Sequence, residues 1–445
     1  MGRNFGTVVV TACVAVIALG VHSASAEVLT LEQCIQQALE TNGSSQYGVP
    51  QARETAHRAG QGIWTAWGGL LPGFSHGYNY SERRLGSVIF NTITGEFIEL
   101  PVDSRTSVSW STNFSIRQTL FDGGANWYSV AQSYHNRAAS REGLRGSENA
   151  LVLGVKEGYF GLLKAQELVA VQEAAVRRAE QFHKTVDSKY ELGSASLSEV
   201  LKAKVDLGTA QLELLRRQND VKTGQASLNT ILNRPVDDPT DVEPVAGEGP
   251  ATPTYEEALA MGRRESPNLQ AAHADLRSAK DNVGIARATL FPTLSWSATR
   301  NFTPRDRSAL FDFDGRFASW FISAGLTFNL FDAFHWKTQI SNARVGAKYA
   351  EERERQTERA VVLAVKQAYL GVDLARESRN VADQTAGSAQ EDYNLAQEKY
   401  NLGAATILDL LKAQESLTRA QTDKVNALYD HYVAVARLQN SIGRR

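Results

Sequence analysis

Apolar residues recur at a spacing of seven along the longest stretches of the chain. One such seam runs from Val365 to Tyr400, and a matching seam runs from Val155 to Tyr190. Repeats of seven are typical of helices that pack as coiled coils. The last helical stretch carries two seams, Ala413 to Ala434 and Ile407 to Leu438, which predicts two helical neighbours for it. Small residues along these seams favour a hollow ring of closely approaching helices over a solid bundle.

Shorter stretches alternate apolar and polar residues instead. From Val108 to Arg117, apolar Trp110 and Phe114 alternate with small polar residues, and the stretch from Trp320 to Asn329 follows the same pattern. A period of two with one polar face predicts half-exposed strands. We expect two β-hairpins and four strands in all. Their shorter strands are expected at 74–81 and 294–302, with polar loops at 82–103 and 303–316.

The alternation allows two folds. An outer-membrane barrel has an apolar outer face and a polar inner face, with aromatic residues near the strand ends. Four strands cannot close a barrel alone, and open edges are not tolerated in lipid, so three chains would be needed to supply twelve strands. A water-soluble sandwich would show the same alternation, so the strands alone leave both folds open.

The chain is duplicated at an offset of 210 residues. Lys189-Tyr190-Glu191-Leu192-Gly193 reappears as Lys399-Tyr400-Asn401-Leu402-Gly403, and Leu120-Phe121-Asp122 reappears as Leu330-Phe331-Asp332. Glycine after the last periodic residue is a usual helix stop, so each longer motif predicts the tight tip of an antiparallel helical hairpin. Asp122 is expected to cap the long helix that follows it. The constant offset predicts two hairpins of equal length, with no insertion in either.

The duplication divides the chain into successive parts. Residues 1–26 are expected to be a secretory signal, because a charged start precedes an apolar run and a small-residue cleavage site. About one extra helical turn is expected in the first repeat, near 44–50. The expected parts are the first repeat at 27–234, a proline-rich acidic linker at 235–253 and the second repeat at 254–445; within them lie short helices at 30–40 and 254–264, β-hairpins at 73–120 and 293–331, and long helical hairpins at 122–233 and 332–442.

Composition and motifs narrow the function. The net charge of −2 argues against nucleic acid as a partner. The sequence contains no metal-binding helix motif, phosphate-binding glycine loop or nucleophile elbow, so we expect no enzyme, no cofactor and no metal. Cys34 is the only cysteine after the signal, and we expect it to be a small buried helix residue. No stretch after the signal is long and apolar enough for a transmembrane helix.

The signal, the duplicated order of helix, β-hairpin and long helical hairpin, the Leu-Phe-Asp motifs and the two tips together resemble the TolC family of outer-membrane efflux proteins. The resemblance covers the whole chain after the signal. It implies a mainly α fold with a transmembrane β-barrel, formed by a homotrimer with a twelve-strand β-barrel in outer-membrane lipid and a twelve-helix α-barrel in the periplasm. It also implies the exit duct of a tripartite efflux or type I secretion system, completed by a periplasmic adaptor (membrane fusion) protein and an inner-membrane pump.

Residue roles follow from the resemblance only where residues match. Tyr400, Asp409 and Glu199 would form the gate or pore constriction. An arginine that locks the family's closed state would fall at Ala405, which leaves the ionic part of that lock without its residue. Ordinary turn packing and helix capping are the alternative roles at these positions. The tips would dock the adaptor through Leu192, Gly193 and Ser194 and through Leu402, Gly403 and Ala404.

A second function is compatible with the long helices. A periplasmic trimeric coiled-coil structural tether without a pore would need the same heptads. Heat-resistant trimers in detergent extracts of the outer membrane would favour the channel, whereas full solubility without detergent would favour the tether. The sequence identifies neither the exported substrate nor the pump.

Overall fold

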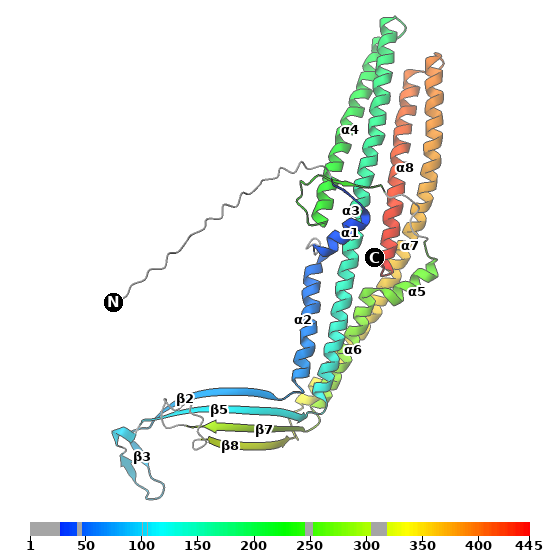
Figure 1. Cartoon of the computed structure of the whole chain (residues 1–445). Helices are drawn as coiled ribbons and strands as arrows, with labels where there is room; N and C mark the ends of the chain where they lie inside the picture. Colours follow the sequence, from blue (N-terminus) through cyan, green and yellow to red (C-terminus); the bar gives the residue numbers. More distant parts are fainter. Residues whose placement is uncertain (1–26, 42–46, 100, 105, 245–251, 304–317) are drawn as a thin grey trace, which may run out of the picture.

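Long helices and one antiparallel sheet make up the computed structural model of the chain, with the sheet lying across one end of the helices (Figure 1). The structure describes residues 27–41, 47–99, 101–104, 106–244, 252–303 and 318–445. The expected secretory signal at 1–26 therefore lies outside the described residues. None of the described helices is both long and apolar enough to cross a membrane.

Four long helices form two antiparallel hairpins that lie side by side (Figure 1). The first consists of α3 (Ala125–Glu191) and α4 (Leu197–Ile231), and the second of α7 (His335–Asn401) and α8 (Ile407–Ser441). α3 and α7 each contain 67 residues, and α4 and α8 each contain 35. The bounds also keep the repeat offset, since 335 − 125 and 441 − 231 are both 210. The prediction of two equal hairpins without insertions is confirmed.

Four shorter helices pack beside the long ones. α1 (Leu31–Glu40) packs on α3, and α5 (Tyr255–Glu265) packs on α7. Both begin at capping boxes, in which a threonine side chain and the side chain three residues later satisfy each other's backbone N–H groups. α2 (Val49–Gly68) packs on α3, and α6 (Pro267–Ala288) packs between α3 and α7. The two predicted short helices are therefore present: α1 begins one residue later than expected and ends where expected, and α5 lies one residue later at both ends.

The extra helical turn expected near 44–50 is not found in α2, which takes in only Val49 and Pro50 of that range. α2 contains 20 residues and its counterpart α6 contains 22, so α2 is not the longer of the two. Gly48 has a left-handed backbone (φ +66°) and Pro50 lies in the first turn of α2, so the helix starts at Val49. The additional residues lie in the connection from α1 to α2, of which 42–46 are outside the described residues.

One antiparallel sheet joins the two predicted β-hairpins. Its strands are β2 (Gly73–Arg84), β5 (Thr106–Phe121), β7 (Thr293–Phe302) and β8 (Ala318–Thr327), in the order β2-β5-β7-β8. The hairpins pair with each other through β5 and β7. In the described part of the chain, β2 and β8 are the edges of this sheet, with no strand beyond them.

The two faces of the sheet differ in polarity, because successive residues of a strand point to opposite sides. The register places Phe114, Arg300 and Trp320 in one row across β5, β7 and β8. Ser115 and Thr299 lie in the next row, on the opposite face. The face that carries Phe114 is called the apolar face below, and the face that carries Ser115 is called the polar face.

A short parallel sheet lies inside the segment expected to be a linker. β6 (Thr240–Val242) pairs with β1 (Glu27–Leu29). The linker at 235–253 is therefore not wholly irregular, since β6 is part of it. Strands of three residues are too short to show a period of two, which is why the sequence pattern missed both.

A second short sheet lies inside the expected polar loop at 82–103. β3 (Val88–Phe90) and β4 (Phe97–Glu99) form a small antiparallel hairpin, and a 3-10 turn follows at Val102–Ser104. The expectation of four strands in all is therefore wrong, since the described residues contain eight. The other expected loop, 303–316, lies outside the described residues except for Thr303.

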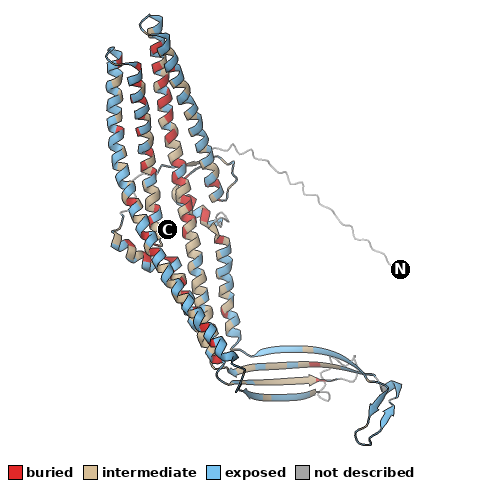
Figure 2. Cartoon of the chain, turned by 180° about the vertical axis from the view of Figure 1, so that it is seen from behind, coloured by how far each residue is buried: buried red, intermediate tan, exposed pale blue. Residues whose placement is uncertain are grey.

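Buried side chains follow the seams between the helices rather than filling one central core (Figure 2). The largest cluster surrounds Val155 and Tyr159 on α3 and includes side chains from α1, α4 and α8. The hydroxyl of Tyr159 donates to the carbonyl oxygens of Leu29 (3.2 Å) and Glu243 (2.6 Å), which ties the β1–β6 sheet to α3. Cys34 is buried in the same cluster, as predicted. A second cluster joins α5, α6, α7 and α8.

The aspartates of the two Leu-Phe-Asp motifs hold the start of the long helices. Asp122 accepts hydrogen bonds from the backbone N–H groups of Gly124 (3.0 Å) and Asn126 (2.9 Å). Asp332 accepts one from the backbone N–H of Trp336 (3.0 Å). Both carboxylates therefore stabilise the first helical turn, but each does so from two residues before the N-cap position.

The turn after each aspartate is strained in the second repeat only. Gly123 (φ +70°) and Gly124 (φ +90°) are left-handed in the first repeat, and Ala333 (φ +53°) and Phe334 (φ +67°) take their places in the second. A side chain in this conformation costs roughly 1–2 kcal/mol, which glycine avoids. A Cβ on Gly123 would lie 2.5 Å from the carbonyl oxygen of Ala288, so the first turn has no room for one.

We expect Ala333→Gly to stabilise the protein by about 0.5–1 kcal/mol, because relief of the left-handed strain exceeds the added entropy of the unfolded chain. Gly123→Ala should destabilise it by more than the strain alone, because the new Cβ meets Ala288. The midpoint of thermal unfolding, followed by helical circular dichroism, measures both. A lower midpoint for Ala333→Gly would contradict the assignment of strain to this turn.

Candidate functional site at the helical tips

Each helical hairpin turns at a left-handed glycine. Gly193 (φ +77°) follows α3, and Gly403 (φ +72°) follows α7. The backbone N–H of Ser194 donates to the carbonyl of Lys189, and that of Ala404 donates to the carbonyl of Lys399, each at 2.8 Å. These bonds close the last helical turn and satisfy carbonyl groups that the helix leaves open. The predicted tips are confirmed as turns, and their conformation explains the glycine in both motifs.

The six residues predicted to dock a partner lie together on these turns and face solvent. The side chains at the tips are almost fully accessible to solvent: Leu192 is 83% exposed and Leu402 is 84% exposed. An added Cβ at Gly193 or Gly403 would meet no atom within 4 Å. Each tip therefore presents an apolar side chain and bare backbone outward, and neither is covered by the chain itself (Figure 2).

The predicted acidic residues cap the returning helices. Glu199 accepts hydrogen bonds from the backbone N–H (2.7 Å) and hydroxyl (3.1 Å) of Ser196 at the start of α4. Asp409 accepts them from the backbone N–H (3.0 Å) and hydroxyl (2.7 Å) of Thr406 at the start of α8. Each carboxylate thus completes a capping box at the first turn of its helix. The hydrogen bonds therefore show that both residues cap a helix.

Asp409 keeps its negative charge at neutral pH. The hydrogen bonds from Thr406, first from its side chain and then from its backbone, lower the pKa of the Asp409 carboxyl below its ordinary value. A lowered folded-state pKa means that the cap stabilises the protein above the pKa of the unfolded chain. That stabilisation is lost as the pH falls through the lower, folded-state pKa. The exposed carboxylate is thus a fixed charge beside the second tip.

Tyr400 lies between the two tips rather than at their surface. Its ring is 8% exposed, whereas Tyr190, at the same place in the first repeat, is 44% exposed. The Phe182 ring packs edge-on at 5.5 Å between centroids, and the Lys189 ammonium lies 4.4 Å from the centroid of the Tyr400 ring. Both partners come from α3, so Tyr400 joins the second hairpin to the first.

Burial raises the pKa of the Tyr400 hydroxyl, and the nearby Glu199 carboxylate raises it further. The side chain is therefore a neutral phenol at physiological pH. The charge of Glu199 thus acts on Tyr400, while Asp409 is exposed on α8. Ala405 has no charged side chain that could pair with Glu199 or Asp409. The Lys189 ammonium instead contacts the Tyr400 ring.

A groove of about 900 Å³ runs between α4 and α8 behind the tips. Its apolar walls include Leu201 and Leu411, which occupy equivalent positions in the two repeats. Leu197, Leu201 and Val205 are all more than half exposed, and their spacing of four along α4 is the signal that would have revealed the groove. Neither the groove nor any other described part of the chain gathers three or more His, Cys, Asp or Glu side chains that could hold a metal ion.

Comparison with known proteins decides the family. The model of the outer membrane efflux protein family matches residues 35–234 and 258–444, which include both tips and both β-hairpins. The chain belongs to the outer membrane efflux protein family. The resemblance to TolC is confirmed, and so is the outer-membrane location, with the helical part in the periplasm.

Individual relatives of this outer membrane efflux protein are distant in sequence. Outer membrane protein TolC of Vibrio cholerae is 22% identical over 433 residues, which cover 96% of this chain and 93% of TolC. Outer membrane efflux protein BepC of Brucella suis is 24% identical over 342 residues, which cover 75% of this chain and 72% of BepC.

Solved structures share the fold. The Campylobacter jejuni CmeC outer membrane channel matches with a TM-score of 0.80 at 17% identity, over 93% of this chain and 85% of CmeC. The outer membrane protein VceC of Vibrio cholerae matches with a TM-score of 0.78 at 18% identity, over 93% of this chain and 96% of VceC. The predicted mainly helical fold of the TolC family is thereby confirmed.

We expect Tyr400→Ala to destabilise the protein by about 2–4 kcal/mol, because it empties a buried site between the hairpins. Tyr190→Ala removes a more exposed ring and should cost less than about 1 kcal/mol. Tyr400→Phe should keep most of the stability, because the Phe182 and Lys189 contacts are made to the ring. Thermal unfolding and the rate of tryptic cleavage at the tips measure the effect, and equal losses at the two tyrosines would refute the assigned asymmetry.

Proposed function

We propose that this outer membrane efflux protein is one of three identical subunits of an exit duct. The observation that carries the proposal is the pair of open edges, β2 and β8, at opposite sides of the sheet. The strands alternate in direction from β2 to β8, so β8 of one subunit can continue the antiparallel order with β2 of the next. Three subunits would close a barrel of twelve strands, which removes every exposed edge from lipid.

The polarity of the two faces supports this arrangement. On the polar face, hydroxyl pairs hydrogen bond across neighbouring strands, Ser75 with Ser115 at 2.6 Å and Ser297 with Ser323 at 2.9 Å. On the apolar face, Leu326 is 67% exposed in the single subunit. A closed barrel with lipid outside and water inside satisfies both faces. A tether without a pore would need neither the paired hydroxyls nor the apolar outer face.

The tips are the proposed docking site for the rest of the export system. The duplication gives six tips in a trimer, each with an exposed leucine beside a left-handed glycine. We propose that these tips bind the ends of helical hairpins of a periplasmic adaptor, which connects the duct to an inner-membrane pump. Such an assembly serves tripartite efflux and type I secretion alike.

Asp409 and Tyr400 are the proposed gate. Three-fold symmetry would bring three Asp409 carboxylates around the narrow end, where they would attract cations and retain multivalent ones. Capping does not conflict with this role, because the carboxylate remains exposed while it accepts the Thr406 hydrogen bonds. With alanine at 405, the closed state would depend on Tyr400 packing between Phe182 and Lys189.

Single-channel recording in planar bilayers tests the duct and its gate together. We expect the wild-type protein to conduct with cation selectivity and to be blocked by trivalent cations. Asp409→Asn should lower the selectivity and relieve the block, because it removes one charge from each subunit at the narrow end. Thr406→Val is the matched control, since it removes capping hydrogen bonds but keeps the charge. Wild-type protein without conductance would refute the duct, and equal effects of the two variants would leave Asp409 with capping alone.

Adaptor docking is tested with charged substitutions at the tip leucines. Leu192→Glu and Leu402→Glu keep the left-handed glycines intact and replace side chains that the subunit does not bury. Burial of a leucine contributes about 1.5–3 kcal/mol, so each change should weaken adaptor binding at least roughly tenfold. Binding to the purified adaptor measures affinity, and growth with a toxic export substrate measures efflux. Val236→Glu, an exposed position far from the tips, is the control; wild-type affinity in both tip variants would rule out this docking site.

A further inference from the structure

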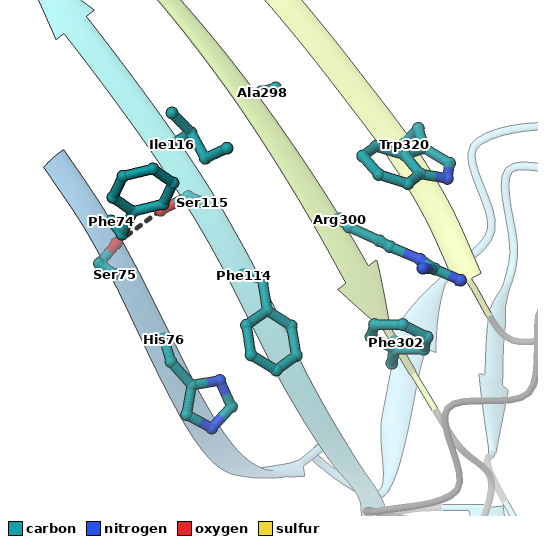
Figure 3. Close-up of a pocket in the computed structure, with 10 residues that line it drawn as sticks. All are labelled: Phe74, Ser75, His76, Phe114, Ser115, Ile116, Ala298, Arg300, Phe302 and Trp320. Carbon is teal, nitrogen blue, oxygen red and sulfur yellow. Dashed lines mark hydrogen bonds between the residues drawn. The ribbon is translucent and has the colours of Figure 1, made fainter. Parts of the chain in front are cut away.

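An arginine, Arg300, lies on the apolar face of the sheet near the end of β7. Arg300 on β7 lies in one row with Phe114 on β5 and Trp320 on β8, and His76 on β2 continues the row (Figure 3). An arginine on the lipid face of a barrel costs roughly 2–4 kcal/mol near the bilayer midplane and about 0–1 kcal/mol near the interfaces, so its depth and its neighbours decide how the charge is accommodated.

Aromatic rings hold the guanidinium in place. Its Cζ lies 4.7 Å from the centroid of the Phe302 ring and 5.1 Å from that of the Trp320 ring. Cation–π contacts of this kind orient a charge but do not neutralise it. The Nε atom is buried and has no hydrogen-bond acceptor among the described residues. The rings therefore position the side chain, while its Nε atom has no hydrogen-bond partner among the described residues.

The surrounding pocket has a volume of about 540 Å³ and is largely apolar, with Phe74 and Ile116 on the side away from Arg300 (Figure 3). None of its ten described lining residues has a carboxylate. Its other ionisable side chain is His76, which stacks on Phe114 with 4.5 Å between ring centroids. Among its described lining residues the pocket thus combines one positive charge, without a carboxylate beside it, with an apolar surface. This combination matches a molecule with an anionic head and hydrocarbon chains.

The position of the pocket selects the leaflet. β7 runs away from the helices, and Arg300 lies near its far end, two residues before Phe302 (Figure 1). Because the helices are periplasmic, the far half of the sheet lies in the outer leaflet of the membrane. A long arginine side chain there can extend its charged end toward the headgroups while its stem stays among apolar side chains.

We propose that this pocket binds a phosphorylated lipid of the outer leaflet, with the lipid phosphate on the Arg300 guanidinium and an acyl chain along Phe74 and Ile116. Arginine suits a phosphate because its planar N–H groups can donate two parallel hydrogen bonds. The phosphate would accept these hydrogen bonds from the terminal N–H groups of the guanidinium, because the Nε atom is buried. This inference rests on the proposed function for the orientation of the apolar face toward lipid.

Native mass spectrometry of the trimer tests the proposal with bisphosphoryl lipid A as the probe. We expect wild-type trimers to retain the lipid, and Arg300→Gln trimers to bind it at least roughly tenfold more weakly, because a charge-assisted hydrogen bond is lost. Arg300→Lys should retain intermediate binding, and Arg117→Gln, which removes an arginine from the polar face of β5, should bind like wild type. A neutral diacylglycerol serves as the lipid without phosphate and should show no dependence on Arg300.

The arms of the experiment separate the outcomes. Equal retention of lipid A by wild type and Arg300→Gln would overturn the proposal while leaving the duct intact, provided that both form trimers of normal heat stability. Displacement of the lipid by millimolar inorganic phosphate would assign the site to a free anion and also overturn it. Equal weakening by Arg117→Gln would show that the lipid responds to total charge rather than to this pocket. Failure of the wild-type protein to form membrane trimers would instead refute the proposed function.

Discussion

The packing of two helical hairpins of equal length is the constraint on which the rest of the structure depends. A helix of 67 residues, about 100 Å long at 1.5 Å per residue, gains its stability from neighbours along its whole length. One inserted residue would shift one tip by 1.5 Å and rotate its side chains by about 100°. The contact of Tyr400 with Phe182 would then be lost, and the two turns would no longer end at the same level. The unbroken offset of 210 residues preserves this match.

Much of this architecture could be predicted from the sequence because it is periodic. The seam from Val365 to Tyr400 and the repeated tip motif located both hairpins and their turns. The short strands β3 and β6 could not be predicted, since three residues show no period. The exposure of Tyr190 and the burial of Tyr400 could not be predicted either, because the same motif surrounds both. The difference comes from α3, which places Phe182 and Lys189 over one tyrosine.

The site residues show the same limit. A carboxylate in the first turn of a helix suits both the helix dipole and a charged pore, so the pattern around Asp409 allowed a cap and a gate alike. Only the hydrogen bonds to Thr406 establish the cap. The surroundings of Arg300 could not be predicted for a different reason. Alternation locates a face by its apolar residues, but it does not show which rings surround a charged side chain there, as those of Phe302 and Trp320 surround Arg300.

The two open edges of the sheet have a consequence for genetics. A subunit whose β2 or β8 cannot pair would leave a gap in any ring that it enters, because each edge has one neighbour in a closed cyclic assembly. In the proposed three-subunit ring, most rings would contain at least one faulty member when a cell makes normal and defective subunits in equal amounts. Alleles that damage an edge strand but leave the helices intact would therefore be dominant, whereas alleles that unfold the whole chain would be recessive.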